Sequence, residues 1–162
     1  MKKIIVAICV TISWIGISNA QDSAPYKANY SSKFTIADES YSNKVLMLWK
    51  DYEENMLDRH LDWFADTVSM IVATGQATKG KAANLAAVKA YRSSLKNMKV
   101  SVDACMSVKS DRGDNAVCIW GTEDFTDQNG KHTVMDMQEV WMFNKDGKIS
   151  MMLQYARPGN AM

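Results

Sequence analysis

One acidic side chain within an apolar strand pattern is the strongest chemical signal in this sequence. Residues 132–143 alternate in character, and one of the two alternating sets is apolar except for a single carboxyl. That set is Met135, Met137, Glu139, Trp141 and Phe143. Because the more apolar face of a sheet packs inward, we expect Glu139 to be buried and its pKa to be raised by desolvation. It could then donate a proton to a ligand carbonyl or act as a weak general base, or it could simply bond to a neighbouring polar side chain.

The elements that would position Glu139 follow a simple order, with helices early and strands late. Apolar residues recur at spacings of three and four in Tyr41–Met56, which predicts a helix with one buried face. Short connections rich in Gly, Asn and Asp separate the later strands, which predicts an antiparallel meander. We therefore expect an α+β fold, a cone-shaped curved antiparallel (mixed) sheet wrapped around a long helix, with two N-terminal helices. The other expected segments are helices at Asp58–Phe64 and Lys81–Asn97, and strands at Val68–Ala73, Gln76–Thr78, Met98–Lys109, Asn115–Phe125, Lys131–Phe143 and Lys148–Ala156.

The N-terminus has the pattern of an export signal. Two lysines precede the apolar run Ile4–Ile17, and small residues lead up to Ala20, after which we expect cleavage. The expected organisation is a signal peptide at 1–20, an extended leader at 21–39, one domain at 40–157 and a tail at 158–162. The mature protein is expected to be periplasmic or extracellular, without a membrane anchor.

Composition argues against several classes of partner. Of 19 basic residues two lie in the signal peptide, which leaves 17 against 18 acidic residues and no basic footprint for nucleic acid. The chain has only two histidines, His60 and His132, and they lack ligand-like spacing. We expect no metal site and no cofactor.

Two cysteines, Cys105 and Cys118, remain after cleavage and lie on successive expected strands. A four-residue loop from Ser110 to Gly113 would place them opposite each other and allow a disulfide, whereas a loop one residue shorter or longer would put them on opposite faces. The alternative is a pair of free, mostly buried thiols.

The domain resembles the nuclear transport factor 2-like superfamily, also called SnoaL-like, which includes ketosteroid isomerase. The resemblance spans Tyr41–Tyr155 and depends on the order and spacing of three motifs. The fold hosts isomerases, dehydratases, hydrolases, cyclases and binding modules, so the resemblance implies a fold more than an activity. The motifs are Trp63-Phe64-Ala65-Asp66, Lys79-Gly80-Lys81, and Val140-Trp141-Met142-Phe143 followed by Asp146-Gly147-Lys148-Ile149.

Carried over residue by residue, the resemblance does not support the isomerase mechanism. That mechanism needs an Asp base and an oxyanion hole made from a Tyr and a protonated Asp. In this sequence Val72 stands at the position of the base, and Leu48 stands at the position of the Tyr. Only the position of the protonated Asp still holds an acidic residue, Glu139. The resemblance also implies pocket residues on the strands beside Glu139, namely Trp120, Thr122, Asp124, Met152 and Gln154.

The leading hypothesis is an exported protein that binds a small apolar or amphipathic molecule in this pocket without catalysis. The alternatives are an isomerase, dehydratase or cyclase using Glu139 with Asp124 for proton transfer, and an interaction module whose cavity is filled by its own side chains. A homodimer through the outer sheet face is expected, because Val134, Val140 and Met142 lie on that face among polar residues.

Overall fold

The computed structural model describes residues 25–159 of the 162-residue chain. The expected signal peptide and its cleavage site at Ala20 lie outside the described residues. The chain divides into two units, 1–30 and 31–162. Residues 25–30 contain bends without a helix or strand, and the second unit holds the elements that form the fold.

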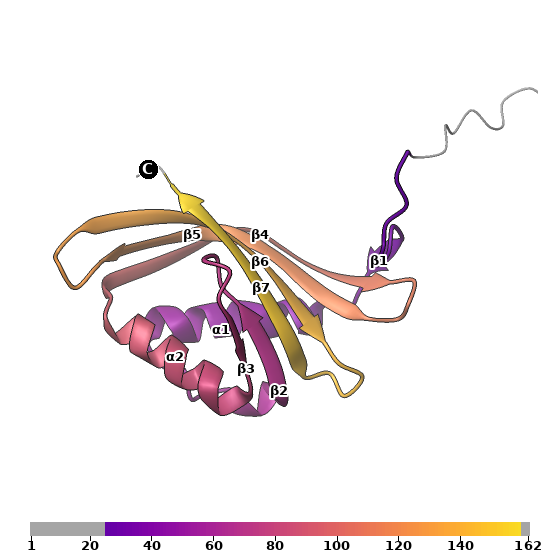
Figure 1. Ribbon diagram of the computed structural model, residues 1–162, viewed down its shortest axis with the longest axis horizontal. Helices are drawn as coiled ribbons and strands as arrows, with labels where there is room; N and C mark the ends of the chain where they lie inside the picture. The colour runs from indigo at the N-terminus through magenta and orange to yellow at the C-terminus, as the bar shows by residue number, and fades with distance from the viewer. Residues whose placement is uncertain (1–24, 160–162) are drawn as a thin grey trace, which may run out of the picture. The chain divides into compact units, whose positions relative to one another are not determined.

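Seven strands, two α-helices and one 3₁₀ turn make up the second unit over its described residues (Figure 1). They are β1 (Phe34–Ile36), α1 (Glu39–Glu54), η1 (Leu61–Trp63), β2 (Phe64–Ile71), β3 (Ala77–Lys79), α2 (Lys81–Ser93), β4 (Lys96–Ser110), β5 (Asn115–Thr126), β6 (His132–Phe143) and β7 (Ile149–Pro158).

The strands form one curved sheet in the order β1-β4-β5-β6-β7-β2-β3. Neighbours are antiparallel except β2 and β7, which are parallel, so the sheet is mixed as expected. Both helices lie on the same side of the sheet (Figure 1). We call the face toward the helices the inner face and the opposite one the outer face. The expected α+β architecture is confirmed.

One expectation about the N-terminal half needs correction. Within the 21–39 segment, β1 pairs with the end of β4, and α1 begins at Glu39 with Asp38 as its cap, accepting from the Ser40 N–H at 2.8 Å. The expected helix at Asp58–Phe64 is only the turn η1, which has no side-chain cap. Contacts between side chains hold this segment in place instead. His60 Nδ1 lies 2.6 Å from Asp51 Oδ2, and the guanidinium of Arg59 donates to Asp51 Oδ1 at 3.3 Å.

The hydrophobic core lies between α1 and the inner face of the sheet. Trp49 of α1 packs directly on Gly121 of β5, where a Cβ would lie 2.8 Å from Cζ3 of Trp49 and 2.1 Å from the Ser101 carbonyl oxygen. Only glycine permits this approach, and the large indole therefore reaches the middle of the sheet. The buried cluster comprises Val45, Trp49, Val68, Met70, Val117, Ile119, Met137, Trp141, Phe143, Ile149 and Met152.

Two buried polar side chains hold α2 in place. Nδ2 of Asn84 donates to the carbonyls of Val68 and Gly80 at 3.1 and 2.8 Å, which joins the start of α2 to β2. At the other end the Arg92 guanidinium donates to three backbone carbonyls, those of Tyr52, Glu53 and Leu95. The positive charge of Arg92 is thereby held beside the last turn of α1 and the start of β4.

Candidate functional site

Glu139 lies on the inner face, as expected, and is 5% exposed. Its Oε2 accepts hydrogen bonds from Nε1 of Trp49 at 2.7 Å and Nε1 of Trp141 at 2.9 Å. Oε1 accepts from Nε2 of Gln154 at 2.9 Å, and Oε1 of Gln154 in turn accepts from the Ala73 N–H at 3.4 Å. Glu139 is therefore a fully bonded group at the centre of the core.

Burial raises the pKa of Glu139, and the hydrogen bonds from Gln154, Trp49 and Trp141 oppose that rise. All three partners are neutral donors, which suit an ionised carboxylate and offer no acceptor for a carboxyl proton. A ligand could reach these oxygens only by displacing a tryptophan or the glutamine. The geometry agrees with the simpler alternative for Glu139, a carboxyl bonded to neighbouring polar side chains.

The expected pairing of Glu139 with Asp124 is not formed. In the β5–β6 register Ile119 lies opposite Glu139, whereas Asp124 lies opposite Val134. Residues directly opposite each other point to the same face, so Asp124 lies on the outer face. Its Oδ1 lies 2.6 Å from Nε2 of His132, with both side chains about half exposed. The sheet separates Asp124 from Glu139, and the two cannot act on one substrate atom.

The same register places Trp120 and Thr122 on the outer face, opposite Gln138 and Asp136. The expected lining was therefore wrong by one residue along β5. The sequence obscures this because the true inner set of β5 is interrupted by Gly121 and Glu123, while the outer set contains the large apolar Trp120. The expected residues of β6 and β7 do lie on the inner face, since Met152 pairs with Trp141, and Gln154 pairs with Glu139.

The methionines do not form an open lining. Met137 and Met152 are buried in the central cluster, and Met135 is half-buried against Phe125 and its neighbours. The interior around Glu139 is packed by side chains of α1, β2, β6 and β7, and these methionines contribute to that packing.

Glu123 is a carboxyl that the sequence reasoning did not identify. It pairs with Met135 across β5 and β6, which puts it on the same face as Glu139. Burial raises its pKa to about 7, reinforced by the charge of Glu139 and opposed by the positive charge of Arg92. Unlike Glu139, it forms no side-chain hydrogen bond with another described residue. The alternation that singled out Glu139 could also have found Glu123, had β5 been placed in the correct register.

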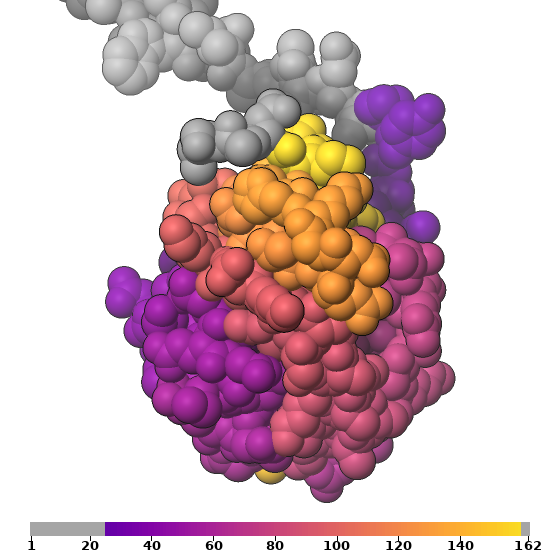
Figure 2. Space-filling model, turned by 90° about the vertical axis from the view of Figure 1, so that its left-hand side faces the viewer, coloured from indigo at the N-terminus to yellow at the C-terminus, as the bar shows by residue number. Residues whose placement is uncertain are grey.

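The cross-strand neighbours of Glu123 are both apolar, Val100 of β4 and Met135 of β6, and both pack against a second cluster. Leu95, Met98 and Phe125 form a second buried cluster, against which Tyr52 and Met135 pack. The phenol of Tyr52 has a raised pKa, caused first by burial and then by the charge of Glu123. This end of the domain, with the β5–β6 hairpin above α1 and α2, faces the reader in Figure 2. Glu123 is half-buried there and is accessible from solvent, which Glu139 is not.

The two cysteines are free thiols that lie on opposite faces. Cys105 pairs with Ile119 on the inner face, and Cys118 pairs with Met106 on the outer face. The hairpin is closed by Ser110 and Asp114, so its loop has one residue fewer than the four that would align the cysteines. Of the two alternatives, the structure has the free thiols, and a Cys105–Cys118 disulfide would require this register to slip by one residue.

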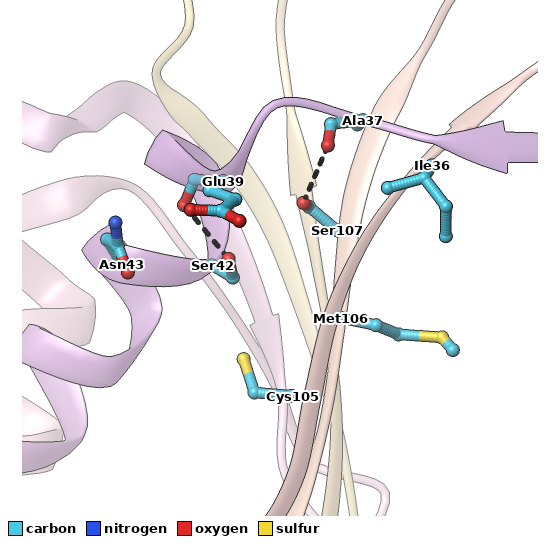
Figure 3. A pocket seen from close by; sticks show the side chains of 8 residues that line it. All are labelled: Ile36, Ala37, Glu39, Ser42, Asn43, Cys105, Met106 and Ser107. Carbon is cyan, nitrogen blue, oxygen red and sulfur yellow. Dashed lines mark hydrogen bonds between the residues drawn. The ribbon is translucent and has the colours of Figure 1, made fainter.

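Two hollows lie away from both glutamates. One, of about 260 Å³, lies between α1 and β4; there Cys105 points toward the helix, and the Ser107 hydroxyl donates to the Ala37 carbonyl at 3.2 Å (Figure 3). The other, of about 420 Å³, is a groove on the outer face that includes Trp120 and Tyr155. Burial raises the pKa of the Cys105 thiol, which makes it a poor nucleophile.

Within residues 25–159, no group of three or more His, Cys, Asp or Glu side chains is arranged to hold a metal ion. In the same part of the chain no helix combines the length and apolar character needed to cross a bilayer.

Solved structures share this fold at low sequence identity. The epoxide hydrolase/cyclase-like enzyme SalBIII, of pyran-ring formation in the polyether salinomycin, is 14% identical with a TM-score of 0.60, covering 74% of this chain and 92% of that one. An LEH-like epoxide hydrolase of M. tuberculosis is 11% identical with a TM-score of 0.59, covering 72% and 82%. The Orange Carotenoid Protein of Anabaena, which binds canthaxanthin, is 20% identical with a TM-score of 0.58, covering 82% of this chain and 41% of that one.

At these identities the structural likeness shows the fold alone. No curated protein matches the chain. Residues 48–152 match the SnoaL-like domain, and this stretch contains the C-terminal part of α1, all of α2, both glutamates and most of the sheet. The chain therefore belongs to the SnoaL-like domain family.

Proposed function

We propose that this SnoaL-like domain binds a small molecule with an apolar body and a hydrogen-bonding group, and that Glu123 is its polar anchor. One observation carries the proposal: Glu123 lies on the inner face, half-buried, without a hydrogen bond to another described residue. Glu139 already has three donors and anchors the core instead. A polar group left unbonded among apolar side chains gains most from a ligand that bonds to it.

The chemistry of Glu123 fits either of two ligand groups. With a pKa of about 7 the carboxyl is present in both forms near neutral pH. The protonated form donates to a carbonyl or ether oxygen, and the ionised form accepts from a hydroxyl or amine. The aromatic and apolar side chains of Tyr52, Phe125 and Met135 would contact the rest of the molecule.

A thermal-shift screen of small amphipathic compounds, repeated on two variants, tests this proposal. Glu123→Ala removes the anchor and is expected to weaken binding of any hit by about tenfold or more. Asp124→Asn changes the adjacent carboxyl, which faces the other side of the sheet, and is expected to leave binding unchanged. Equal losses in the two variants, or hits that bind Glu123→Ala as well as wild type, would contradict the proposal.

A second candidate is proton-transfer catalysis by Glu123, which its pKa near neutrality favours. In that case Glu123→Gln keeps the affinity for a hit compound but abolishes its conversion. If the site binds its ligand without catalysis, the wild-type protein does not convert the compound. Glu123→Gln then removes only the dependence of Kd on pH between about 6 and 8. Mass spectrometry of the hit compounds after incubation separates the two.

We also propose a homodimer through the apolar half of the outer face. Cys118, Val140 and Leu153 form one cross-strand row there, and Met142 and Met151 pair in the next. These side chains are only partly buried, and both helices lie on the other side of the sheet (Figure 1). Sedimentation equilibrium is expected to show a dimer that Met142→Glu dissociates and Thr122→Glu, on the polar half, does not. A monomer at all concentrations would refute it.

Export remains a proposal as well, supported by the lysine pair, apolar run and small residues before Ala20. N-terminal sequencing of the protein recovered from the periplasm or medium of a bacterial host is expected to begin at Gln21. Recovery only inside the cell, with Met1 retained, would overturn it.

A further inference from the structure

The outer-face groove of about 420 Å³ differs in character from the apolar half of the same face. Its centre is one cross-strand row, in which Gln138 of β6 lies between Trp120 of β5 and Tyr155 of β7. The adjoining row carries Asp136 and Arg157, whose side chains form an ion pair at 3.0 Å. The groove thus has two aromatic walls and a polar floor.

Several polar groups of the groove have no hydrogen-bond partner among residues 25–159. The side chains of Trp120, Gln138 and Tyr155 form no hydrogen bond with another described residue, and neither does the carboxylate of Asp103, which lines the groove from β4. Tyr155 is 59% exposed. Since Asp136 and Arg157 neutralise each other, Asp103 leaves the lining with one net negative charge.

The spacing of the two aromatic positions on the sheet suits a cation site. Adjacent strands lie about 4.8 Å apart, so residues two strands apart, such as Trp120 and Tyr155, are separated by about 10 Å at their bases. A cation midway between such walls is about 5 Å from each, within the roughly 6 Å over which an aromatic face attracts a cation. A flat uncharged ring stacked between two aromatic side chains would need walls closer together.

We propose that this groove binds an organic ammonium group, of the trimethylated kind, between the rings of Trp120 and Tyr155, with the carboxylate of Asp103 balancing its charge. The site lies on the opposite face of the sheet from Glu123 and is independent of the proposed interior function. Gln138, at the floor, is available to a hydroxyl or carbonyl on the rest of the ligand.

The test compares choline with 3,3-dimethylbutan-1-ol, which has the same shape but no charge, by amide NMR titration of the full chain. We expect choline to bind about tenfold more tightly, with shifts centred on Trp120, Gln138 and Tyr155. Affinity is expected to fall with added salt, because the groove is open and its charge is screened. Equal affinity for the two compounds, binding of a neutral sugar but not choline, or shifts centred on β2 and α1 would overturn the proposal.

Matched variants separate the contributions. Tyr155→Ala and Trp120→Ala should each weaken choline severalfold, whereas Phe34→Ala, at another exposed aromatic position, should not. Asp103→Asn should weaken choline while Asp62→Asn, on the exposed turn η1, has no effect. Arg157→Gln should strengthen binding, because it leaves the charge of Asp136 uncompensated. Tyr155 is exposed enough that its substitution leaves the core intact, so unchanged affinity in that variant would also refute the assignment.

Discussion

Replacing Glu123 by glutamine should stabilise the protein, and the gain should grow with pH. In the folded protein the pKa of Glu123 is raised to about 7 from an ordinary value of 4.5. The folded state therefore holds a proton that the unfolded state has released at intermediate pH. The stability due to Glu123 is fully present below about pH 4.5 and is lost as the pH rises through about 7. Glutamine resembles the protonated form at every pH and does not incur this loss.

The size of the effect follows from the pKa difference between the two states. A rise from 4.5 to about 7 corresponds to at most about 3.5 kcal/mol in the free energy of unfolding, at about 1.4 kcal/mol per pKa unit. Because Glu123 is only half-buried, solvent screening reduces the value that we expect to measure. Glu123→Gln should have nearly wild-type stability at about pH 4.5 and exceed it by about 1–3 kcal/mol at about pH 8.

Urea unfolding followed by tryptophan fluorescence at a series of pH values measures this difference. Asp124→Asn is the matched control, because it neutralises the next carboxyl along the chain on the exposed face. Its effect should be small, because the Asp124–His132 pair is exposed to solvent. A Glu123→Gln effect that is constant across the pH range, or a variant that becomes less stable than wild type as the pH rises, would refute the reasoning.

Three further substitutions test the packing beneath this site. Glu139→Ala leaves two buried indole N–H groups and the Gln154 amide without their acceptor and should cost about 3 kcal/mol or more in urea unfolding; a cost below about 1 kcal/mol would contradict the bonded role of Glu139. Gly121→Ala forces a Cβ against the Ser101 carbonyl and the Trp49 ring, so it should lower the free energy of unfolding by about 2–3 kcal/mol and change the fluorescence emission of Trp49. Wild-type stability in this variant would show that the neighbouring atoms move aside without cost. Asn84→Ala should destabilise the start of α2 by about 1–3 kcal/mol and increase amide hydrogen exchange there. Unchanged protection from exchange would contradict a stabilising role for the hydrogen bond from Asn84 to the Val68 carbonyl.

The fold could be predicted from the sequence because its signals are local. Helical spacing in α1, turn residues between the later strands and the alternation of β6 each depend on a few neighbouring residues. The turn η1 was harder to foresee, because contacts of Arg59 and His60 with Asp51, rather than backbone propensity, fix that segment.

The candidate site was only half predictable, because it depends on the register between strands. The inner position of Glu139 follows from alternation within β6 alone, whereas the face of β5 relative to Glu139 depends on the length of the hairpin that joins β5 to β6. One residue of difference in that hairpin would exchange Glu123 for Asp124 at the inner face, and one residue of difference in the β4–β5 hairpin separates Cys105 from Cys118. Alternation on β5 could not correct the error, because Trp49 requires a glycine at position 121 and a carboxyl occupies position 123.

The most direct test of the account is a ¹³C NMR titration of the Glu123 side-chain carboxyl, in the free protein and with the strongest hit of the ligand screen bound. The account predicts a midpoint of about 7 in the free protein and a clear displacement of that midpoint when the ligand is bound. An ordinary midpoint of about 4.5, or a midpoint near 7 that bound ligand leaves unchanged, would contradict the assignment of Glu123 as the anchor.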